Sequence, residues 1–189
     1  NGSGSTQEIK HGATILATGG KEYRGYEYSY GADQRILTQQ QLEHKLANQA
    51  EEMKSVRSMV MILCVGPAEK YCSRICCTVA LKNALALKQL APSAQVVVFY
   101  RDIRTYGFGE RLYTRAREQG ILFVRYEGSR KPEVDVGEPG DKLHVRAWEP
   151  ALKRQLQLQP DLLVLSMPIV PQADASETAA LFNVTLDND

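Results

Sequence analysis

The sequence predicts an α/β fold: a Rossmann-like parallel sheet with flanking helices, followed by an antiparallel β-meander. Two observations predict it. Between Met59 and Arg125, short β-branched and apolar runs alternate with longer amphipathic segments, an order typical of right-handed crossovers and of a parallel sheet covered on both faces. Beyond residue 140 apolar and polar residues alternate, which is typical of antiparallel strands.

The individual elements follow from local patterns. A buried strand is expected within 12–20, near 13–17, because a β-branched run ends at a glycine pair. Thr38 can cap a helix over 38–49, whose apolar residues share one stripe. The periodic region predicts strands at 59–65, 95–100 and 121–125, with helices at 73–90 and 109–119. The meander is expected at 142–149, 153–159 and 161–170, and a short capped helix at 174–184.

Composition excludes several functions. The formal net charge of +1 provides no strongly basic field for nucleic-acid binding. The longest apolar runs are far shorter than the roughly 20 residues that cross a bilayer, so no membrane segment is expected. A chain of 189 residues with 43% hydrophobic content can bury a core, and residues 1–6 read as a linker or tag remnant.

The four cysteines, Cys64, Cys72, Cys76 and Cys77, lie close together in the stretch VMILCVGPAEKYCSRICC. Such a cluster indicates metal or redox chemistry in a reducing compartment, by default the cytoplasm. If the helix begins near 71–73, Cys72 and Cys76 share a face, Cys77 is turned about 100° away, and Cys64 ends the preceding strand. The spacing favours an iron–sulfur cluster, while zinc, a thiol–disulfide switch and core packing remain open.

Two further features surround this cluster. Gly66 is the one glycine of a dinucleotide fingerprint present in the turn, so tight nucleotide binding there is not expected. The helix N-terminus, Lys70 and Arg74 should lower the thiol pKa values. Arg101 and Arg104 could contact a phosphate or a partner, although an ion-paired loop explains them more simply.

Three stretches carry a family resemblance: CVGPAEKYCSRICCTVALKNALALK, VVVFYRDIRTYGFGERLYTRAREQGILFVRYEG and GATILATGGKEY. They resemble the central part of HdrA, the flavin-containing subunit of heterodisulfide reductase. The resemblance implies a second Rossmann-like domain inserted in an FAD-binding domain, as in the nucleotide domain of flavin disulfide reductases. It also implies that Cys64, Cys72, Cys76 and Cys77 bind a [4Fe-4S] cluster, and that Thr18, Gly19 and Gly20 approach the FAD.

The resemblance also implies an organisation and a role. Residues 7–37 and 160–189 would join a flavin domain, and 38–159 would form the inserted domain. The full-length protein would be an oxidoreductase that transfers electrons between the cluster, FAD, other heterodisulfide reductase subunits and an electron-donating hydrogenase or dehydrogenase, whereas this chain alone would be inactive. Two alternatives remain: an NAD(P)H-binding domain of a flavin-dependent disulfide oxidoreductase, and a non-catalytic zinc or subunit-docking domain.

Overall fold

The computed structural model describes residues 7–69, 72–138 and 140–187 of the chain. These residues fall into two compact units. The larger unit runs from Glu22 to Ile169, and the smaller unit combines the two ends of the chain, up to Lys21 and from Val170. Each unit is described below by itself.

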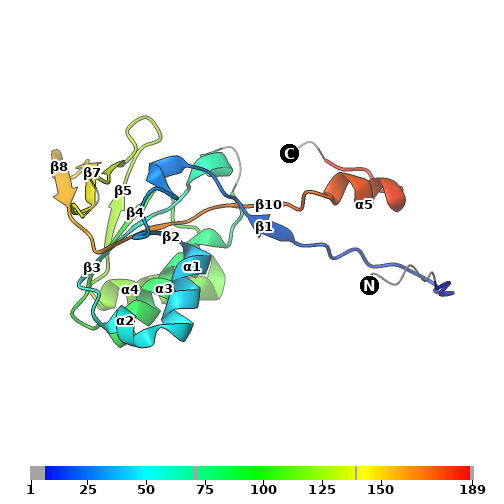
Figure 1. Cartoon of the computed structure of the whole chain (residues 1–189), viewed down its shortest axis with the longest axis horizontal. Coiled ribbons are helices and arrows are strands. Elements are labelled where there is room, and N and C mark those ends of the chain that lie inside the picture. Colours follow the sequence, from blue (N-terminus) through cyan, green and yellow to red (C-terminus); the bar gives the residue numbers. More distant parts are fainter. Residues whose placement is uncertain (1–6, 70–71, 139, 188–189) are drawn as a thin grey trace. The chain divides into compact units, whose positions relative to one another are not determined.

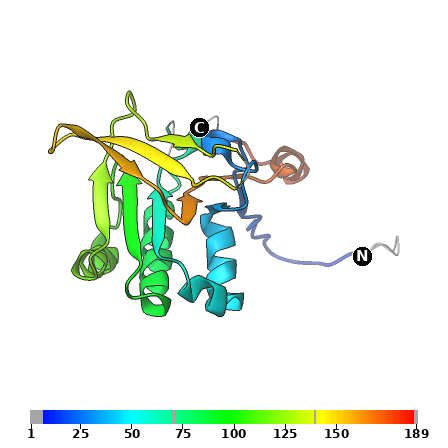
Figure 2. The same cartoon turned by 60° about the vertical axis from the view of Figure 1, so that its left-hand side comes forward.

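A five-stranded parallel sheet forms the centre of the larger unit (Figure 1). Its strands, in spatial order, are β2 (Ile36–Thr38), β9 (Leu162–Leu165), β3 (Ser58–Ile62), β4 (Gln95–Tyr100) and β5 (Leu122–Arg125). The arrowheads of β3, β4 and β5 point to the same edge in Figure 2. This carboxyl edge is where ligands bind in open α/β sheets.

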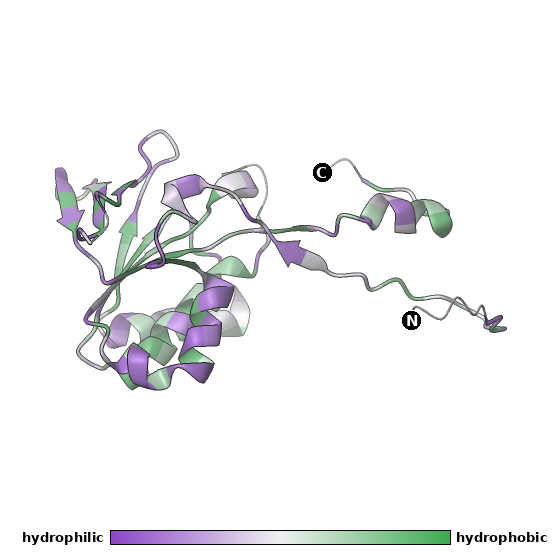
Figure 3. Cartoon of the chain, viewed as in Figure 1, coloured by the Kyte–Doolittle hydropathy of each residue, from purple (hydrophilic) through white to green (hydrophobic). Residues whose placement is uncertain are grey.

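Helices cover one face of the parallel sheet: α1 (Gln39–Asn48), α2 (Ala50–Lys54), α3 (Cys76–Leu90) and α4 (Glu110–Glu118). Successive residues of a strand point to opposite faces. Met59 and Met61 of β3 therefore pack against the helices, whereas Val60 and Ile62 pack on the other side. Both sets are buried, which explains why β3 is apolar from Met59 to Ile62 (Figure 3).

An antiparallel sheet covers the opposite face, with strands in the order β6 (Glu133–Asp135), β7 (His144–Glu149) and β8 (Arg154–Leu158). Val145 and Ala147 of β7 are buried in the core that this sheet shares with the parallel sheet.

The predicted α/β fold class is confirmed. The described helices, however, cover one face of the parallel sheet instead of both, and the predicted meander is wrong in one strand. The run at 161–170 supplies β9 of the parallel sheet, because a fully apolar strand is stable where both its faces are covered. The third strand of the antiparallel sheet is β6 instead. The sequence did not predict β6, because the residues around it are rich in Gly and Pro and read as a loop.

The smaller unit contains the helix α5 (Ala175–Leu181), which confirms the short helix expected at 174–184. Where the two units adjoin along the chain, β1 (Gly20–Glu22) and β10 (Ile169–Pro171) form a two-stranded sheet. The buried strand predicted near 13–17 is wrong: residues 13–17 carry no strand and Ile15 is 91% exposed. A strand needs a partner for its backbone groups, and no described strand pairs with this run.

Two points of organisation follow. Ile36 and Leu37 of β2 lie within the range 7–37 and all of β9 lies within 160–189, yet both are strands of the five-stranded sheet. The assignment of those ranges to a flavin-domain connection stays a prediction. In the parts of the chain that the structure describes, no helix combines the length and apolarity needed to cross a membrane.

The N-terminus of α1 bears out the predicted cap. The Thr38 hydroxyl accepts a hydrogen bond from the Gln41 amide at 3.3 Å, and the Gln41 side chain accepts one from the Thr38 amide at 2.8 Å. We expect Thr38→Ala to lower the free energy of unfolding by about 1 kcal/mol, because two amides at the helix start lose this arrangement. Urea denaturation would measure the loss. The exposed Gln40→Ala in the same turn serves as the control and should change little, and equal losses would contradict the capping role.

Candidate metal centre

A cavity of about 800 Å³ lies at the carboxyl edge of β3, β4 and β5. All four cysteines line it, although they come from three segments: the end of β3, the connection before α3, and the first turn of α3. The opposite walls come from the segments after β4 and β5 and from the β7–β8 turn, with Arg101, Asp102, Arg104, Arg125, Tyr126, Glu127, Gly128, Glu149, Pro150 and Ala151. The sequence cluster is therefore also a cluster in space.

Cys64 lies two residues beyond β3 in a turn with unusual backbone geometry. Its φ is +61°, a left-handed conformation that residues other than glycine adopt infrequently. Hydrogen bonds hold the preceding residue: the Leu63 amide donates to the Phe99 carbonyl at 2.9 Å, and the buried Tyr126 hydroxyl donates to the Leu63 carbonyl at 2.6 Å. These contacts fix the direction in which the Cys64 side chain leaves the backbone.

The other three thiols surround the N-terminus of α3. Cys76 and Cys77 are its first two residues, and their sulfurs contact the Met167 carbonyl at 3.7 Å and the Asp102 carbonyl at 3.6 Å. Cys72 precedes the helix, and its sulfur accepts a hydrogen bond from the Arg74 amide at 3.4 Å. The helix thus begins at Cys76, later than the predicted 71–73. The prediction that Cys72 and Cys76 share one face of this helix is therefore wrong. Arg74 has a left-handed φ of +62°, which a continuous helix does not allow. A turn rather than a helix therefore brings Cys72 to the cavity.

Burial dominates the electrostatics of the thiols. It raises the pKa of Cys64 and Cys77, and it raises the pKa of Cys76 to about 11, with smaller contributions from the negative charge of neighbouring thiolates. The expectation that the helix N-terminus and nearby basic residues lower the pKa values is therefore wrong for these three thiols, and Lys70 lies outside the described residues. Desolvation of a thiolate outweighs the partial charge of a helix end. Metal binding at these three sulfurs has to displace their protons.

The donor set fits a four-iron cluster better than a single ion. All four cysteines are free. Across the described ranges, no three His, Cys, Asp or Glu side chains stand at the spacing of ligands to one metal ion. In a [4Fe-4S] cluster each thiolate binds a different iron atom, so its ligands lie farther apart than those of one zinc ion. Four free thiols that line one partly buried cavity are the donor set that such a cluster needs.

The turn at Gly66 is covered by side chains of the same chain. Gly66 has a φ of +59°, and a Cβ placed on it would lie 2.7 Å from the Tyr23 ring and 2.9 Å from the Glu27 carboxylate. The Tyr23 hydroxyl donates a hydrogen bond to that carboxylate at 3.0 Å. In a dinucleotide site the glycine-rich turn leaves its backbone open to the pyrophosphate. Here a ring and a negative charge occupy the open side of the turn.

The glycine turn predicted to approach FAD lies in another part of the chain. Thr18 and Gly19 lie in the exposed segment before β1, and Gly20 is the first residue of β1. Gly19 has a φ of +65°, as expected of a tight turn. All three belong to the smaller compact unit. Their approach to a flavin stays a prediction.

Sequence reasoning missed several residues of the cavity. The sequence gives no indication that Tyr126 belongs to the cavity, because a tyrosine directly after a strand resembles an ordinary core residue. The β7–β8 turn at 149–151 could not be placed while the third meander strand was assigned to 161–170. The segment after β4 did give a signal, because residues that follow a parallel strand lie at the ligand-binding edge. Both arginines of that segment line the cavity with the thiols.

Comparison with known proteins places the chain in a family. No family model matches it. The iron–sulfur HdrA subunit of the CoB–CoM heterodisulfide reductase of Methanocaldococcus jannaschii is 34% identical over 203 residues, which cover 96% of this chain and 30% of that protein. The corresponding subunit of the H(2)/formate:CoB-CoM heterodisulfide,ferredoxin reductase of Methanococcus maripaludis is 34% identical over 197 residues, which cover 93% and 29%. The chain belongs to the HdrA family of heterodisulfide reductase subunits. It spans less than a third of the length of these two relatives.

Solved structures agree with the predicted fold of this chain. Thioredoxin reductase of T. acidophilum matches 90% of this chain and 47% of its own, with a TM-score of 0.55 and 12% sequence identity. The FAD-bound cadaverine monooxygenase DfoA of Erwinia amylovora matches 92% of this chain and 48% of its own, with a TM-score of 0.55 and 11% identity. At such low identity the likeness shows the fold alone.

Proposed function

We propose that the chain is the thioredoxin-reductase-like domain of a flavo-iron–sulfur oxidoreductase, in which Cys64, Cys72, Cys76 and Cys77 hold a [4Fe-4S] cluster. The observation that carries the proposal is the meeting of these four thiols, from three segments of the chain, at one cavity on the carboxyl edge of the sheet. Such a cluster, when bound, accepts and donates single electrons. Membership of the HdrA family supports this role.

The chain's own residues would hold and shield the thiolates. Tyr126 fixes the peptide before Cys64, and the Arg74 amide donates a hydrogen bond to the Cys72 sulfur. Cys76 and Cys77 lie in the first turn of α3, whose unpaired amides and dipole favour negative charge. Partial burial keeps water from the sulfurs, and burial is one of the factors that set the potential of an iron–sulfur centre.

The role of the full-length protein is an extension of this proposal. We expect it to bind FAD near Thr18, Gly19 and Gly20, with residues 7–37 and 160–189 leading into the flavin domain. Its partners would be the other heterodisulfide reductase subunits and an electron-donating hydrogenase or dehydrogenase, in line with the hydrogen, formate and ferredoxin in the relatives' names. Unpaired cysteines suit a reducing compartment such as the cytoplasm. This chain alone should transfer no electrons to a heterodisulfide.

Anaerobic reconstitution tests the proposal. The 189-residue chain is incubated with iron and sulfide, and in parallel with zinc alone. We expect four irons per chain, broad visible absorption, and a paramagnetic signal that develops on reduction by one electron. Uptake of zinc with no stable iron chromophore would favour a structural or docking domain instead.

An NAD(P)H-binding domain is the second candidate. It is favoured by the position of the cavity at the carboxyl ends of three parallel strands and by the arginines that line it. The covered turn at Gly66 weighs against it, because Tyr23 and Glu27 fill the side from which a pyrophosphate would approach. Titration of the reconstituted chain with NADH and NADPH separates the two. Saturable binding at physiological concentrations would support the second candidate.

A further inference from the structure

We infer that the segment Arg101–Arg104, which follows β4, sets the reduction potential of the centre held by the four cysteines. The inference rests on the proposed function and deepens it, because it assigns a role to residues that bind no metal. The segment lies beside the thiols on the cavity wall. Arg101 and Arg104 are therefore positioning residues that act on the centre through the sulfurs.

The backbone of the segment contacts one of the sulfurs. The Asp102 carbonyl lies 3.6 Å from the Cys77 sulfur. Arg101, Asp102 and Arg104 line the cavity that the four thiols share. Positive charge beside the sulfurs of a cluster stabilises the added charge of the reduced state and so raises its potential.

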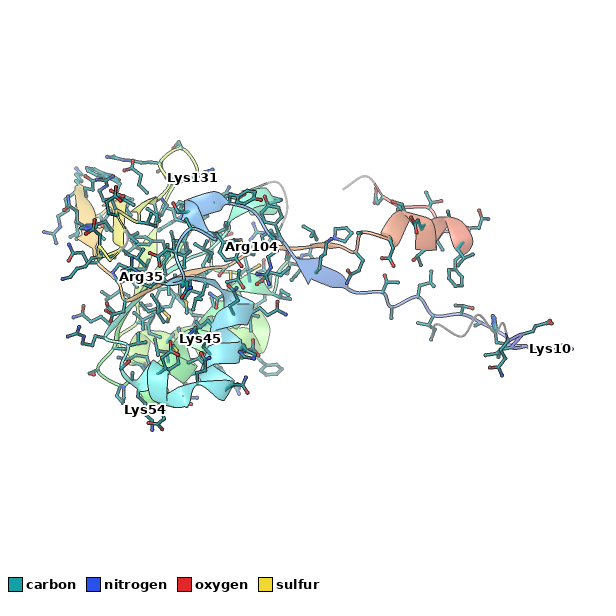
Figure 4. All side chains as sticks on the ribbon, viewed as in Figure 1. Lys10, Arg35, Lys45, Lys54, Arg104 and Lys131 are labelled. Atoms are coloured by element: carbon teal, nitrogen blue, oxygen red, sulfur yellow. The ribbon has the colours of Figure 1, made fainter. Side chains whose placement is uncertain are left out.

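The two guanidinium groups add positive charge on the same side. The Arg101 side chain reaches across to Gly128 on the β5 wall, and both residues line the cavity with Cys64. Arg104 (Figure 4) pairs with Asp102 at 3.1 Å and lines the cavity together with Cys72. Half-buried charges are screened less by salt than fully exposed ones. Each arginine should therefore stabilise the reduced centre more than an exposed arginine elsewhere would.

Asp102 provides the opposite sign within the same segment. Asp102 lines the same cavity, where its carboxylate adds negative charge, and it offsets the charge of Arg104 through their ion pair. Removal of this carboxylate should raise the potential, whereas removal of either arginine should lower it. A segment that served structure alone would not produce opposite shifts from neighbouring residues.

Redox titration of the reconstituted 189-residue chain at fixed ionic strength tests the inference. We expect Arg101→Gln and Arg104→Gln to move the midpoint potential to more negative values, Asp102→Asn to move it to more positive values, and Arg104→Lys to return it close to the wild-type value. Arg111→Gln is the matched control, because Arg111 is exposed and stacks on Phe108 rather than lining the cavity. It should shift the potential least.

The outcomes separate this inference from the proposed function. If the wild-type chain takes up no cluster, the proposed function fails and the inference with it. Suppose that the chain takes up a cluster, but the midpoint potentials of Arg101→Gln and Arg104→Gln equal that of the wild type or shift no more than that of Arg111→Gln. The inference alone is then overturned. A shift of Asp102→Asn in the negative direction would also overturn it. Thermal melts identify any variant that misfolds, and the exposed fractions of the Arg104 and Asp102 side chains, 42% and 64%, favour folding of the variants at these two positions.

Discussion

Replacement of Cys76 by alanine is expected to abolish the four-iron centre. Cys76 is the first residue of α3, and burial together with the other three thiols raises its pKa above that of an ordinary thiol. Loss of a group that only orients a ligand typically reduces metal affinity about 10–100-fold. Loss of a ligand itself should reduce the affinity at least as much, and should leave one iron without a thiolate.

The same result is expected for alanine at Cys64, Cys72 and Cys77, because each would bind a different iron. Iron and sulfide content after anaerobic reconstitution, together with electron paramagnetic resonance, measures the loss. Thr78→Ala is the matched control, since Thr78 follows Cys77 in the same helical turn and does not line the cavity. A single cysteine variant that retains four irons and the wild-type signal would remove that residue from the ligand set.

Phe99→Ala is expected to cause the largest loss of stability among simple core substitutions, about 3–5 kcal/mol. Phe99 lies on β4 with no exposed surface, and its ring belongs to the core between the parallel sheet and β7. Removal of the ring leaves a cavity where the antiparallel sheet is docked. The Phe99 carbonyl also accepts the Leu63 amide, so loosening at this position should reach the Cys64 turn.

Urea denaturation measures this effect on the free energy of unfolding. Leu122→Ala is the control, because Leu122 lies on the neighbouring strand β5 with 61% of its surface exposed, and it should cost about 0.5 kcal/mol or less. Phe99→Leu, which retains most of the apolar volume, should lie between the two. A loss below about 1 kcal/mol for Phe99→Ala would mean that the antiparallel sheet contributes little to the core.

The cavity has the general architecture of a nucleotide site, and we propose that it serves a different ligand chemistry. The carboxyl edge of the sheet, the turn after β3 and the N-terminus of α3 are all present. The turn, however, carries Cys64 and a covered Gly66 in place of an open glycine loop. An edge and a helix end that favour an anion can serve an anionic metal centre as well as a phosphate.

The sequence by itself determined the elements whose signals are local. The cap at Thr38, the apolar strands β3 and β4 and the grouping of four cysteines depend on neighbouring residues, and each is present in the structure. The resemblance to HdrA also rested on short contiguous stretches, and the relatives confirm it.

Only the tertiary structure decided what depends on distant partners. It assigned Leu162–Leu165 to the parallel sheet, because that strand pairs with β2 and β3 across long stretches of chain. Residues 13–17 form no strand, because no described strand pairs with the hydrogen-bonding groups of their backbone. The tertiary structure also reversed the expected pKa shifts of three thiols, because burial is a property of the packed molecule and outweighs the local charges that a sequence reveals.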